Sequence, residues 1–327
     1  MPKFYLVTGG TGFIGSALVH RLIKKGLNVR VFDNNSRGSF NRLNDITDKI
    51  DFFEGDIRDK RTVNRAMEDI DSVIHLAFVN GTEFFYTKPE FVLDVGVKGI
   101  TNILDACQEK NVRELVLASS SEVYQTPPIY PTNESVPLSI PDPLNPRYSY
   151  AAGKIISEIM AINFGRKFFD RVIIFRPHNV YGPDMGWEHV IPQFAVRIKQ
   201  LLNNSSEKTI RFPVQGNGSD TRSFIFIEDF ISGLELILDK GKHLEIYHIG
   251  TQEEISIANL ANMVADYYNQ NICIVPGQAA LGGTQRRCPD ISKMRSLGFH
   301  PKYSLKEGLS QTLKWYDSAS VIADSKT

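Results

Sequence analysis

The chain has 327 residues, enough for one large domain or for two smaller domains that share a cleft. It contains 37 basic and 37 acidic residues, so its formal net charge is zero and no overall field attracts nucleic acid or anionic lipid. Its three cysteines are scattered without metal-ligand spacing, and no apolar run reaches membrane-spanning length. We therefore expect a cytoplasmic protein with no disulfide framework, metal site, nucleic-acid partner or membrane segment.

Strand-like and helix-like segments alternate through the first half of the chain. The strands predicted there are Phe4–Thr8, Val29–Asp33, Ile50–Glu54, Ser72–Leu76, Leu115–Ser119 and Val172–Arg176. The helices predicted between them are Ile14–Lys25, Val63–Ile70, Val97–Glu109 and Tyr150–Phe164. Because alternating strands and helices build parallel sheets, we predict an α/β fold with a Rossmann-type, doubly wound parallel sheet.

A glycine-rich segment, Gly9 to Gly15, follows the first predicted strand and opens the first helix. The glycines in this segment permit a tight turn, close approach to a pyrophosphate and close helix packing. The diphosphate of a dinucleotide would lie at the positive N-terminus of the helix. The cofactor-binding residues predicted in this turn are Gly9, Gly12, Phe13, Ile14 and Gly15.

Asp33 ends the second predicted strand, where a carboxylate accepts hydrogen bonds from ribose hydroxyls and repels a 2′-phosphate. This position favours NAD over NADP, although an arginine such as Arg37 could accommodate a 2′-phosphate. We also expect Asn34 to contact the cofactor. Asp56 and Ile57, after the third strand, are placed to meet the adenine, and Asp56 could also be a helix N-cap.

The stretch from Pro127 to Pro146 is rich in proline, so it cannot be regular helix or central strand. It predicts an ordered loop over the carboxyl edge of the sheet, where open α/β folds bind ligands.

Tyr150 and Lys154 lie four residues apart in a predicted helix, so their side chains share one face. A nearby cation favours the phenolate and lowers a tyrosine pKa that starts near ~10. A tyrosine with a lowered pKa can exchange a proton with a substrate hydroxyl near neutral pH. The pair therefore predicts a proton-transfer site, provided that the rest of the chain supplies a cofactor beside it.

After Pro183 the simple alternation of strands and helices ends. The elements predicted there are helices over Ile191–Leu202, Ile257–Tyr268 and Leu305–Trp315 and a short strand over Ile272–Val275. Phe224–Ile227 and Tyr247–Gly250 could return to the first domain. We therefore expect an NAD-binding domain over residues 1–180, joined by residues 220–250. A smaller, mixed α/β domain over residues 181–327 would bind mainly the substrate.

Motifs along nearly the whole chain carry a resemblance to a known family. They are Thr8–Gly15, Asp33–Gly38, Gly55–Asp59, His75–Ala77, Ser119–Tyr124, Tyr150–Lys154, Arg176–Pro183, Arg222–Phe224 with Asp229, and Arg287–Asp290. On these motifs the chain resembles the extended short-chain dehydrogenases, specifically the nucleotide-sugar epimerase/dehydratase family.

The resemblance implies a shared opening step at a sugar hydroxyl, usually that of C4. Tyr150 would take the proton while a hydride passes to NAD, and Lys154 would hold the nicotinamide ribose and keep the Tyr150 pKa low. Ser120 stands at the position that hydrogen-bonds the same sugar oxygen. Leu76 and Ala77 would contact the cofactor. The family also commonly forms homodimers through a four-helix bundle, for which Val97–Glu109 and the helix of Tyr150 are candidates.

Ser121 and Glu122 bear on the fate of the resulting 4-keto sugar. The 4,6-dehydratases of the family carry Thr-Asp-Glu here, and Ser121 replaces the aspartate that protonates the departing hydroxyl. Glu122 suggests chemistry or contacts near C5, since simple 4-epimerases generally lack an acid there; it could also pair with an arginine. Uronate decarboxylases carry Thr-Ser-Glu, which is similar to the sequence here.

For the nucleoside diphosphate of the substrate, Asn179, Arg222 and Arg287 are the candidates, because planar guanidinium groups match phosphate oxygens. Asp290 could accept a ribose hydroxyl or pair with Arg287. Pro146-Arg147 and the segment from Arg287 also look like segments of the uronate decarboxylases. Our leading hypothesis is an NAD-dependent nucleotide-sugar epimerase, followed by a uronate decarboxylase and a dehydratase. A non-catalytic NAD-sensing protein on the same fold is the alternative from another class.

Three further features of the chain lie outside these assignments. Gly96 stands where many relatives have an asparagine. The aromatic segment Asn80–Tyr86 could face the sugar or could anchor a loop by burial. His178 and Trp187–His189 are candidate sugar contacts that we leave outside the catalytic set.

Overall fold

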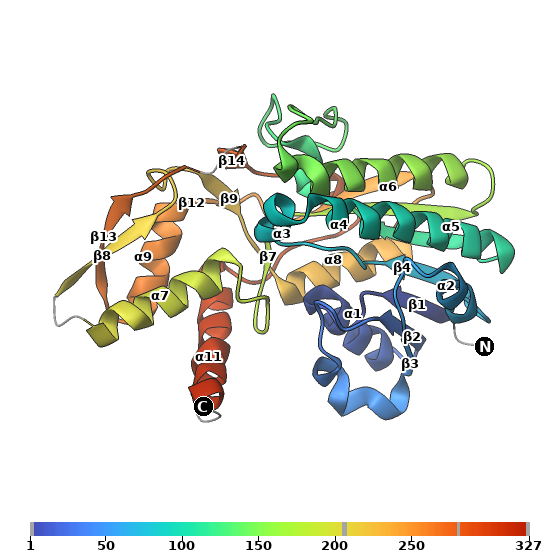
Figure 1. The fold of residues 1–327 in the computed structure, drawn as a ribbon, viewed down its shortest axis with the longest axis horizontal. Coiled ribbons are helices and arrows are strands. Elements are labelled where there is room, and N and C mark those ends of the chain that lie inside the picture. Colours follow the sequence, from blue (N-terminus) through green and yellow to red (C-terminus); the bar gives the residue numbers. More distant parts are fainter. Residues whose placement is uncertain (1–2, 205–207, 280–281, 325–327) are drawn as a thin grey trace.

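The computed structural model describes residues 3–204, 208–279 and 282–324. Its largest sheet is built from seven strands: β1 (Phe4–Thr8), β2 (Asn28–Asp33), β3 (Asp51–Glu54), β4 (Ser72–His75), β5 (Glu114–Ala118), β6 (Arg171–Pro177) and β11 (Glu245–Ile249). Their order across the sheet is β11-β6-β5-β4-β1-β2-β3, and every neighbouring pair is parallel (Figure 1). This order confirms the predicted Rossmann-type fold.

Both faces of this sheet are buried. Neighbouring residues of a strand point to opposite faces, so consecutive apolar residues contribute to both. Leu6 and Val7 of β1 belong to two different hydrophobic cores. Helices α2 (Lys60–Ala66), α5 (Gly99–Glu109) and α6 (Ser149–Gly165) cover the face of Leu6. Helices α1 (Phe13–Lys24) and α8 (Ile227–Lys240) cover the face of Val7. The continuous apolar strands of the sequence are therefore explained by burial on two sides.

The connection from β4 to α5 is less regular than predicted. It contains the short helices α3 (Thr82–Thr87) and α4 (Pro89–Leu93) and one π-helical turn, η2 (Asp94–Lys98), which delays the start of α5 to Gly99. Other short helical turns are η1 (Phe40–Lys49), η3 (Ser121–Tyr124) and η4 (Pro146–Tyr148). A π-helical turn within a helical segment, such as η2, often accompanies a functional site.

The second half of the chain forms a smaller region of mixed structure beside the large sheet (Figure 1). Its helices are α7 (Val190–Asn204), α9 (Ile257–Tyr267), α10 (Ser292–Ser296) and α11 (Leu305–Asp324). Its strands are β7 (Val180–Tyr181), β8 (Thr209–Val214), β9 (Thr221–Ser223), β10 (Ile225–Phe226), β12 (Glu254–Ser256), β13 (Asn271–Pro276) and β14 (Arg286–Arg287). β11 returns to the large sheet as expected, whereas β10 pairs with β7.

The proline-rich stretch is an irregular loop, as predicted, and it is anchored to the second half of the chain. The Thr132 amide donates to the carbonyl of Cys288 at 2.8 Å, and the Asp290 amide donates to the carbonyl of Thr132 at 2.7 Å. These bonds hold the segment after β14 against the loop. Among the helices of the described ranges, none is long and apolar enough to cross a membrane.

Candidate active site

The turn between β1 and α1 leaves a cradle for a phosphate group. Gly9 has a positive φ of 72°, and a Cβ atom on it would lie 2.8 Å from the backbone nitrogen of Ala77. A Cβ on Gly15 would lie 2.1 Å from the Gly9 carbonyl oxygen. Gly12 is the N-cap of α1 and provides no side-chain cap, so the first helical N–H groups remain available for an anion. The turn therefore fits a pyrophosphate.

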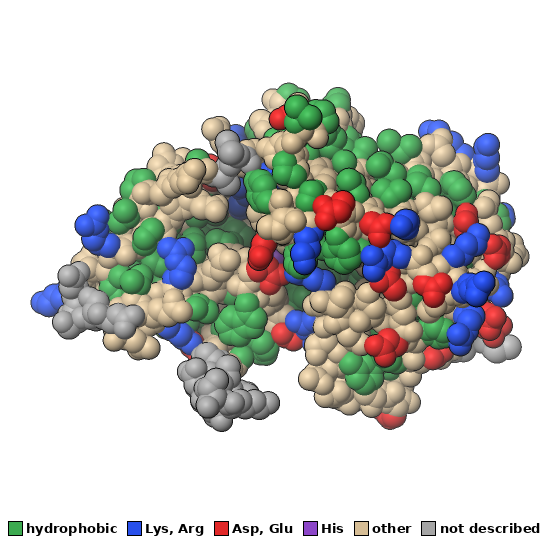
Figure 2. All heavy atoms as spheres, in the orientation of Figure 1, with side chains coloured by type: hydrophobic (Ala, Val, Ile, Leu, Met, Phe, Trp, Pro, Cys, Tyr) green, Lys and Arg blue, Asp and Glu red, His purple; other side chains and the backbone are tan. Residues whose placement is uncertain are grey.

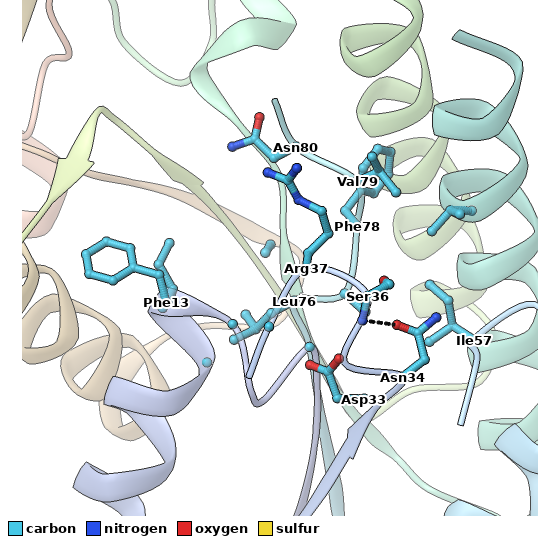
Figure 3. A pocket seen from close by; sticks show the side chains of 18 of the residues that line it. Phe13, Asp33, Asn34, Ser36, Arg37, Ile57, Leu76, Phe78, Val79 and Asn80 are labelled. Carbon is cyan, nitrogen blue, oxygen red and sulfur yellow. Dashed lines mark hydrogen bonds between the residues drawn. The ribbon is translucent and has the colours of Figure 1, made fainter. Parts of the chain in front are cut away.

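Asp33 lies at the end of β2 and is held in place by backbone amides. Its carboxylate accepts hydrogen bonds from the amides of Thr11 at 3.0 Å and Asn35 at 2.9 Å. Asn34 donates to the carboxylate of Asp56 at 3.1 Å, and its own side-chain oxygen accepts the amide of Ser36 (Figure 3). These contacts fix two acidic side chains at neighbouring strand ends, where ribose hydroxyls are bound in this fold.

The alternative role of Asp56 as a helix N-cap is wrong. The N-cap of α2 is Asp59, whose carboxylate accepts the Arg61 amide at 3.0 Å. Asp56 instead forms an ion pair with Arg58 at 2.8 Å, and this hydrogen bond lowers the Asp56 pKa.

The end of β4 is tied to the end of β1 by Thr8. The Thr8 hydroxyl lies 2.7 Å from Nδ1 of His75 and accepts the Ala77 amide at 3.2 Å. Burial lowers the pKa of His75 to about 3, so this ring is neutral at physiological pH. Leu76 and Ala77 are thereby placed on the wall of the cleft.

All of the predicted cofactor residues line one cleft, and Tyr150 lies in the same cleft. They are Gly9, Gly12, Phe13, Ile14, Gly15, Asp33, Asn34, Asp56, Ile57, Leu76, Ala77 and Lys154. Figure 3 shows ten labelled side chains of this cleft, with Asp33, Asn34 and Ile57 on one side and Phe13 on the other.

Arg37 does not extend toward Asp33; its side chain points toward Asn80 (Figure 3). Its guanidinium forms an ion pair with Glu188 and lies 4.9 Å from the centre of the Phe84 ring. The arginine that argued for NADP is therefore engaged by two other groups. Glu188 is the member of the Trp187–His189 segment with a defined contact at the cleft.

Tyr150 and Lys154 lie on the buried face of α6, and both have less than a tenth of their surface exposed. The Lys154 ammonium donates to the Ala118 carbonyl at 2.8 Å. Burial lowers the pKa of Lys154 to about 7, while Glu158 acts in the opposite direction. The predicted spacing thus brings both side chains to one site next to the end of β5.

The predicted lowering of the Tyr150 pKa by Lys154 is not found. Burial raises the pKa of Tyr150, because a phenolate is poorly solvated in this position. A hydrogen bond with Ser120 lowers the pKa, and the charge of Glu122 raises it. Ser120 is therefore the neighbour that favours the ionised phenol most.

Aromatic side chains surround Tyr150. The Phe85 ring is stacked on it with centroids 4.8 Å apart, and the Phe78 ring meets it edge-on at 5.2 Å. The Lys154 ammonium lies 4.1 Å from the centre of the Phe78 ring. The aromatic segment Asn80–Tyr86 thus contributes Phe85 to the site, and burial anchors it there.

Ser120, Ser121 and Glu122 follow β5 and enter η3. Ser120 is the N-cap of this turn, and its hydroxyl accepts the Glu122 amide at 3.1 Å. The Glu122 carboxylate accepts a hydrogen bond from Arg287 at 2.9 Å and lies 3.9 Å from the Arg147 guanidinium. Burial would raise the Glu122 pKa, but these two arginines lower it, so the carboxylate is ionised at neutral pH.

Three arginines converge around Glu122. Arg222 lies close enough to lower the Glu122 pKa as well, and burial together with Arg287 lowers the pKa of Arg222 to about 10. The Nε atoms of Arg147 and Arg287 are buried and have no hydrogen-bond partner in the described part of the chain. Asp220 also acts on Arg222, but two carboxylates do not balance three guanidinium groups, so the cluster favours an anion. The motif Pro146-Arg147 had pointed to Arg147, but its contact with Glu122 depends on the tertiary structure.

Two predicted substrate residues have other partners. Asn179 donates its side-chain amide to the carbonyl of Ser223 at 3.0 Å, which fixes the segment next to Arg222. Asp290 accepts the Ser292 amide at 2.8 Å. The predicted pairing of Asp290 with Arg287 is wrong, because Arg287 pairs with Glu122 across the site.

A buried polar network behind Lys154 was not predicted. Glu158 forms an ion pair with Arg176 at 2.6 Å and accepts the Ser119 hydroxyl. Arg176 also donates to the Tyr124 hydroxyl, which lies 2.7 Å from Nε2 of His248. The feature of the sequence that could have indicated this network is the position of Glu158, one helical turn after Lys154. This network holds the side chains behind Lys154 in place.

The fold and the cleft define a dinucleotide-binding α/β protein with a tyrosine and a lysine in the cleft and an arginine cluster near the tyrosine. Residues 5–250 match the NAD dependent epimerase/dehydratase family. The chain belongs to this family, and NAD is its cofactor.

The relatives of the chain carry out different reactions. The chain is 30% identical to a UDP-N-acetyl-alpha-D-glucosaminuronate decarboxylase of Bacillus cytotoxicus, over 97% of this chain and 98% of the relative. It is 31% identical to a UDP-glucose 4-epimerase of Mycolicibacterium smegmatis, over 96% and 99%. Among solved structures, a dTDP-glucose 4,6-dehydratase from Streptomyces venezuelae with NAD bound superposes with a TM-score of 0.85 at 29% identity, covering 98% of both chains. NAD-dependent modification of nucleotide sugars is common to these enzymes, whereas the final reaction differs.

Proposed function

We propose that the protein is an NAD-dependent epimerase of a nucleoside-diphosphate sugar that works through a transient 4-keto sugar. The observation that supports this most is the placement of Tyr150, Ser120 and Lys154 together at one end of the dinucleotide cleft. Tyr150 takes the hydroxyl proton of the sugar when it is ionised to the phenolate. Ser120 hydrogen-bonds the same sugar oxygen, and its hydrogen bond with Tyr150 favours the phenolate against the effect of burial. When bound, NAD supplies the hydride acceptor that completes the oxidation and returns the hydride afterwards.

The chain offers a defined set of groups for each half of the cofactor. The N-terminus of α1 holds the diphosphate, with Gly9, Gly12 and Gly15 giving the close approach. The Asp33 carboxylate accepts hydrogen bonds from the hydroxyls of the adenosine ribose. Lys154 binds the nicotinamide ribose at the opposite end of the cofactor. Residues 1–180 with 220–250 would then form the cofactor domain, and residues 181–327 would contribute mainly to substrate binding.

The fate of the keto sugar is inferred from the acids near Tyr150. Elimination of water needs an acid that protonates the departing hydroxyl. Ser121 is not such an acid, and Glu122 is ionised because Arg287 and Arg147 lower its pKa. This arrangement disfavours a dehydratase. Return of the hydride to the other face of the sugar needs no such acid, which supports epimerisation.

Decarboxylation of a nucleoside-diphosphate uronate is the second candidate, and Arg147 supports it. If Arg222 and Arg287 hold the diphosphate, Arg147 remains beside Glu122, and its buried Nε has no hydrogen-bond partner among the described residues. A guanidinium in this position could bind a sugar carboxylate. The carboxylate on C5 is β to the C4 ketone, so it can leave as carbon dioxide while the electron pair of the broken bond forms an enolate at C4. A proton then adds at C5, and the departure itself needs no acid at Ser121.

A panel of UDP-, GDP-, CDP- and dTDP-sugars, including uronates, tests both candidates. An unchanged product mass with altered sugar stereochemistry indicates an epimerase. Release of carbon dioxide indicates a decarboxylase, and loss of water indicates a dehydratase. Conversion of no nucleotide sugar under any condition would contradict the proposal and favour the non-catalytic NAD-binding alternative.

We also propose a homodimer formed through α6 and α5. Ile156 and Ile159 of α6 are exposed by 38% and 53%. Hydrophobic side chains are visible at the surface in the part of the molecule where α6 lies (Figures 1 and 2). Apolar positions one turn apart on an exposed helix favour packing against a second helix. Size-exclusion chromatography with light scattering tests this: Ile159→Glu should convert a dimer to a monomer. A monomer in the parent protein would contradict the proposal.

A further inference from the structure

Phe78 occupies a slot that two glycines make for it. A Cβ atom on Gly96 would lie 2.3 Å from Cζ of Phe78, and a Cβ on Gly153 would lie 2.9 Å from the same atom. Gly96 belongs to the π-helical turn η2, and Gly153 precedes Lys154 on α6. Any larger side chain at position 96 would displace the ring. The glycine that departs from the family pattern therefore has a steric reason in this chain.

The ring in this slot contacts both members of the proton-transfer pair. Its centre lies 4.1 Å from the Lys154 ammonium and 5.2 Å from the centre of the Tyr150 ring. An ammonium over an aromatic face is attracted by the ring quadrupole, most strongly when water is excluded. The Ala118 carbonyl accepts one ammonium hydrogen at 2.8 Å from another direction. Two contacts thus fix the direction of the remaining donor hydrogens of Lys154.

We propose that Phe78 is a positioning residue, which orients the Lys154 ammonium and the Tyr150 phenol relative to each other from a slot kept open by Gly96. The inference rests on the roles proposed above for Tyr150 and Lys154. It differs from a packing role because the ring would act on a charge, so its effect depends on whether Lys154 is protonated. A merely structural phenylalanine would contribute the same stability at every pH.

The charged groups near Lys154 allow this difference to be measured. Burial brings the Lys154 pKa to about 7, so the side chain is mostly protonated at pH 6 and mostly neutral at pH 9. His75 has a pKa lowered to about 3, burial raises the pKa of Tyr150 further above its ordinary value, and Glu158 is paired with Arg176. Lys154 is therefore the group beside Phe78 that changes charge between these two pH values.

The first experiment measures thermal unfolding of Phe78→Leu at pH 6 and pH 9. We expect the melting temperature to fall by about 2 °C more at pH 6, because the ring attracts the ammonium there. This extra loss should disappear in a Lys154→Met background. Phe169→Leu, a buried phenylalanine in the same core, is the matched control and should cost the same at both pH values. Equal losses of Phe78→Leu at both pH values, or an extra loss that persists with Lys154→Met, would overturn the inference.

The second experiment measures turnover and keeps the inference testable if Phe78→Leu folds poorly. Gly96→Ala should displace the ring and lower kcat about tenfold while the KM for the nucleotide sugar changes less than about threefold. In a Phe78→Leu background, Gly96→Ala should have less than a twofold further effect, since the shorter side chain leaves the slot open. Additive effects of the two changes on kcat would contradict the proposal. If the parent enzyme converts no nucleotide sugar, the proposed function fails, and the unfolding experiment still decides the role of Phe78.

Discussion

The cofactor cleft and the arginine cluster beside it are constructed differently. The cleft is built from backbone: a glycine turn, the ends of parallel strands and a helix N-terminus, with Asp33 held by two amides. The arginine cluster is built from side chains of distant segments, and its three guanidinium groups outnumber the two nearby carboxylates, Glu122 and Asp220, among the described residues. The cofactor cleft is therefore a rigid site that suits one ligand, NAD. The arginine cluster keeps excess positive charge that an anionic substrate can neutralise.

Tyr150, where the two regions meet, should give the largest effect. Tyr150→Phe removes the proposed proton acceptor, and turnover should fall about 10³-fold. NAD affinity, measured by calorimetry, should stay within about threefold, since the cradle at Gly9–Gly15 does not depend on the phenol. Tyr148→Phe is the matched control, because Tyr148 is also buried but lies in η4. Turnover that survives Tyr150→Phe would place the proton acceptor elsewhere.

Gly15→Ala tests whether the glycine turn of the cofactor cleft tolerates a side chain. The added Cβ would lie 2.1 Å from the Gly9 carbonyl oxygen, so the whole turn must shift. We expect NAD affinity to fall about 100-fold in calorimetry, with binding of a nucleoside diphosphate to the arginine cluster unchanged. Gly26→Asn is the control, because Gly26 has a positive φ that asparagine tolerates and open space around it. Equal loss of both ligands would show that the two regions are one cooperative unit.

The same contrast explains what could be predicted from the sequence. The convergence of the residues from Gly9 to Ala77 on one cleft was predictable because their geometry follows from strand ends and a turn, which local patterns specify. The pairing of Glu122 with Arg287 was not predictable in this way, since the two residues are brought together by β14 and the loop anchored on Thr132. Asp290, three residues from Arg287 in sequence, was the nearer candidate and is turned to Ser292.

The sign of the Tyr150 pKa shift was also beyond the sequence. The spacing of Tyr150 and Lys154 shows that a charge lies nearby, but burial of both groups dominates the pKa of each. Burial at this position depends on Phe78 and Phe85, which come from a different segment than α6.

Glu122→Gln tests the charge balance of the arginine cluster. Removal of the negative charge leaves Arg287 and Arg147 without their shared counter-charge and increases the repulsion among the three arginines. We expect turnover to fall about 30-fold and the affinity for free nucleoside diphosphate to rise, because the cluster becomes more positive. NAD affinity should change less than about twofold. A large change in NAD affinity would show that the charge of Glu122 serves the cofactor cleft instead.

Glu188→Gln should give the smallest effect. It tests whether charge at the edge of the cofactor cleft affects the choice between NAD and NADP. The side chains of Arg37 and Glu188 are exposed by 32% and 37%, and an ion pair with this exposure contributes about 0–1 kcal/mol. Loss of the pair frees Arg37, so NADP should gain affinity relative to NAD by no more than about fivefold. The gain should vanish when Arg37→Gln is added and should weaken at high salt, as expected for a partly exposed charge. A gain that persists without Arg37 would mean that Glu188 acts on the cofactor directly. Both outcomes make selection at this edge electrostatic, unlike the steric selection at Gly15.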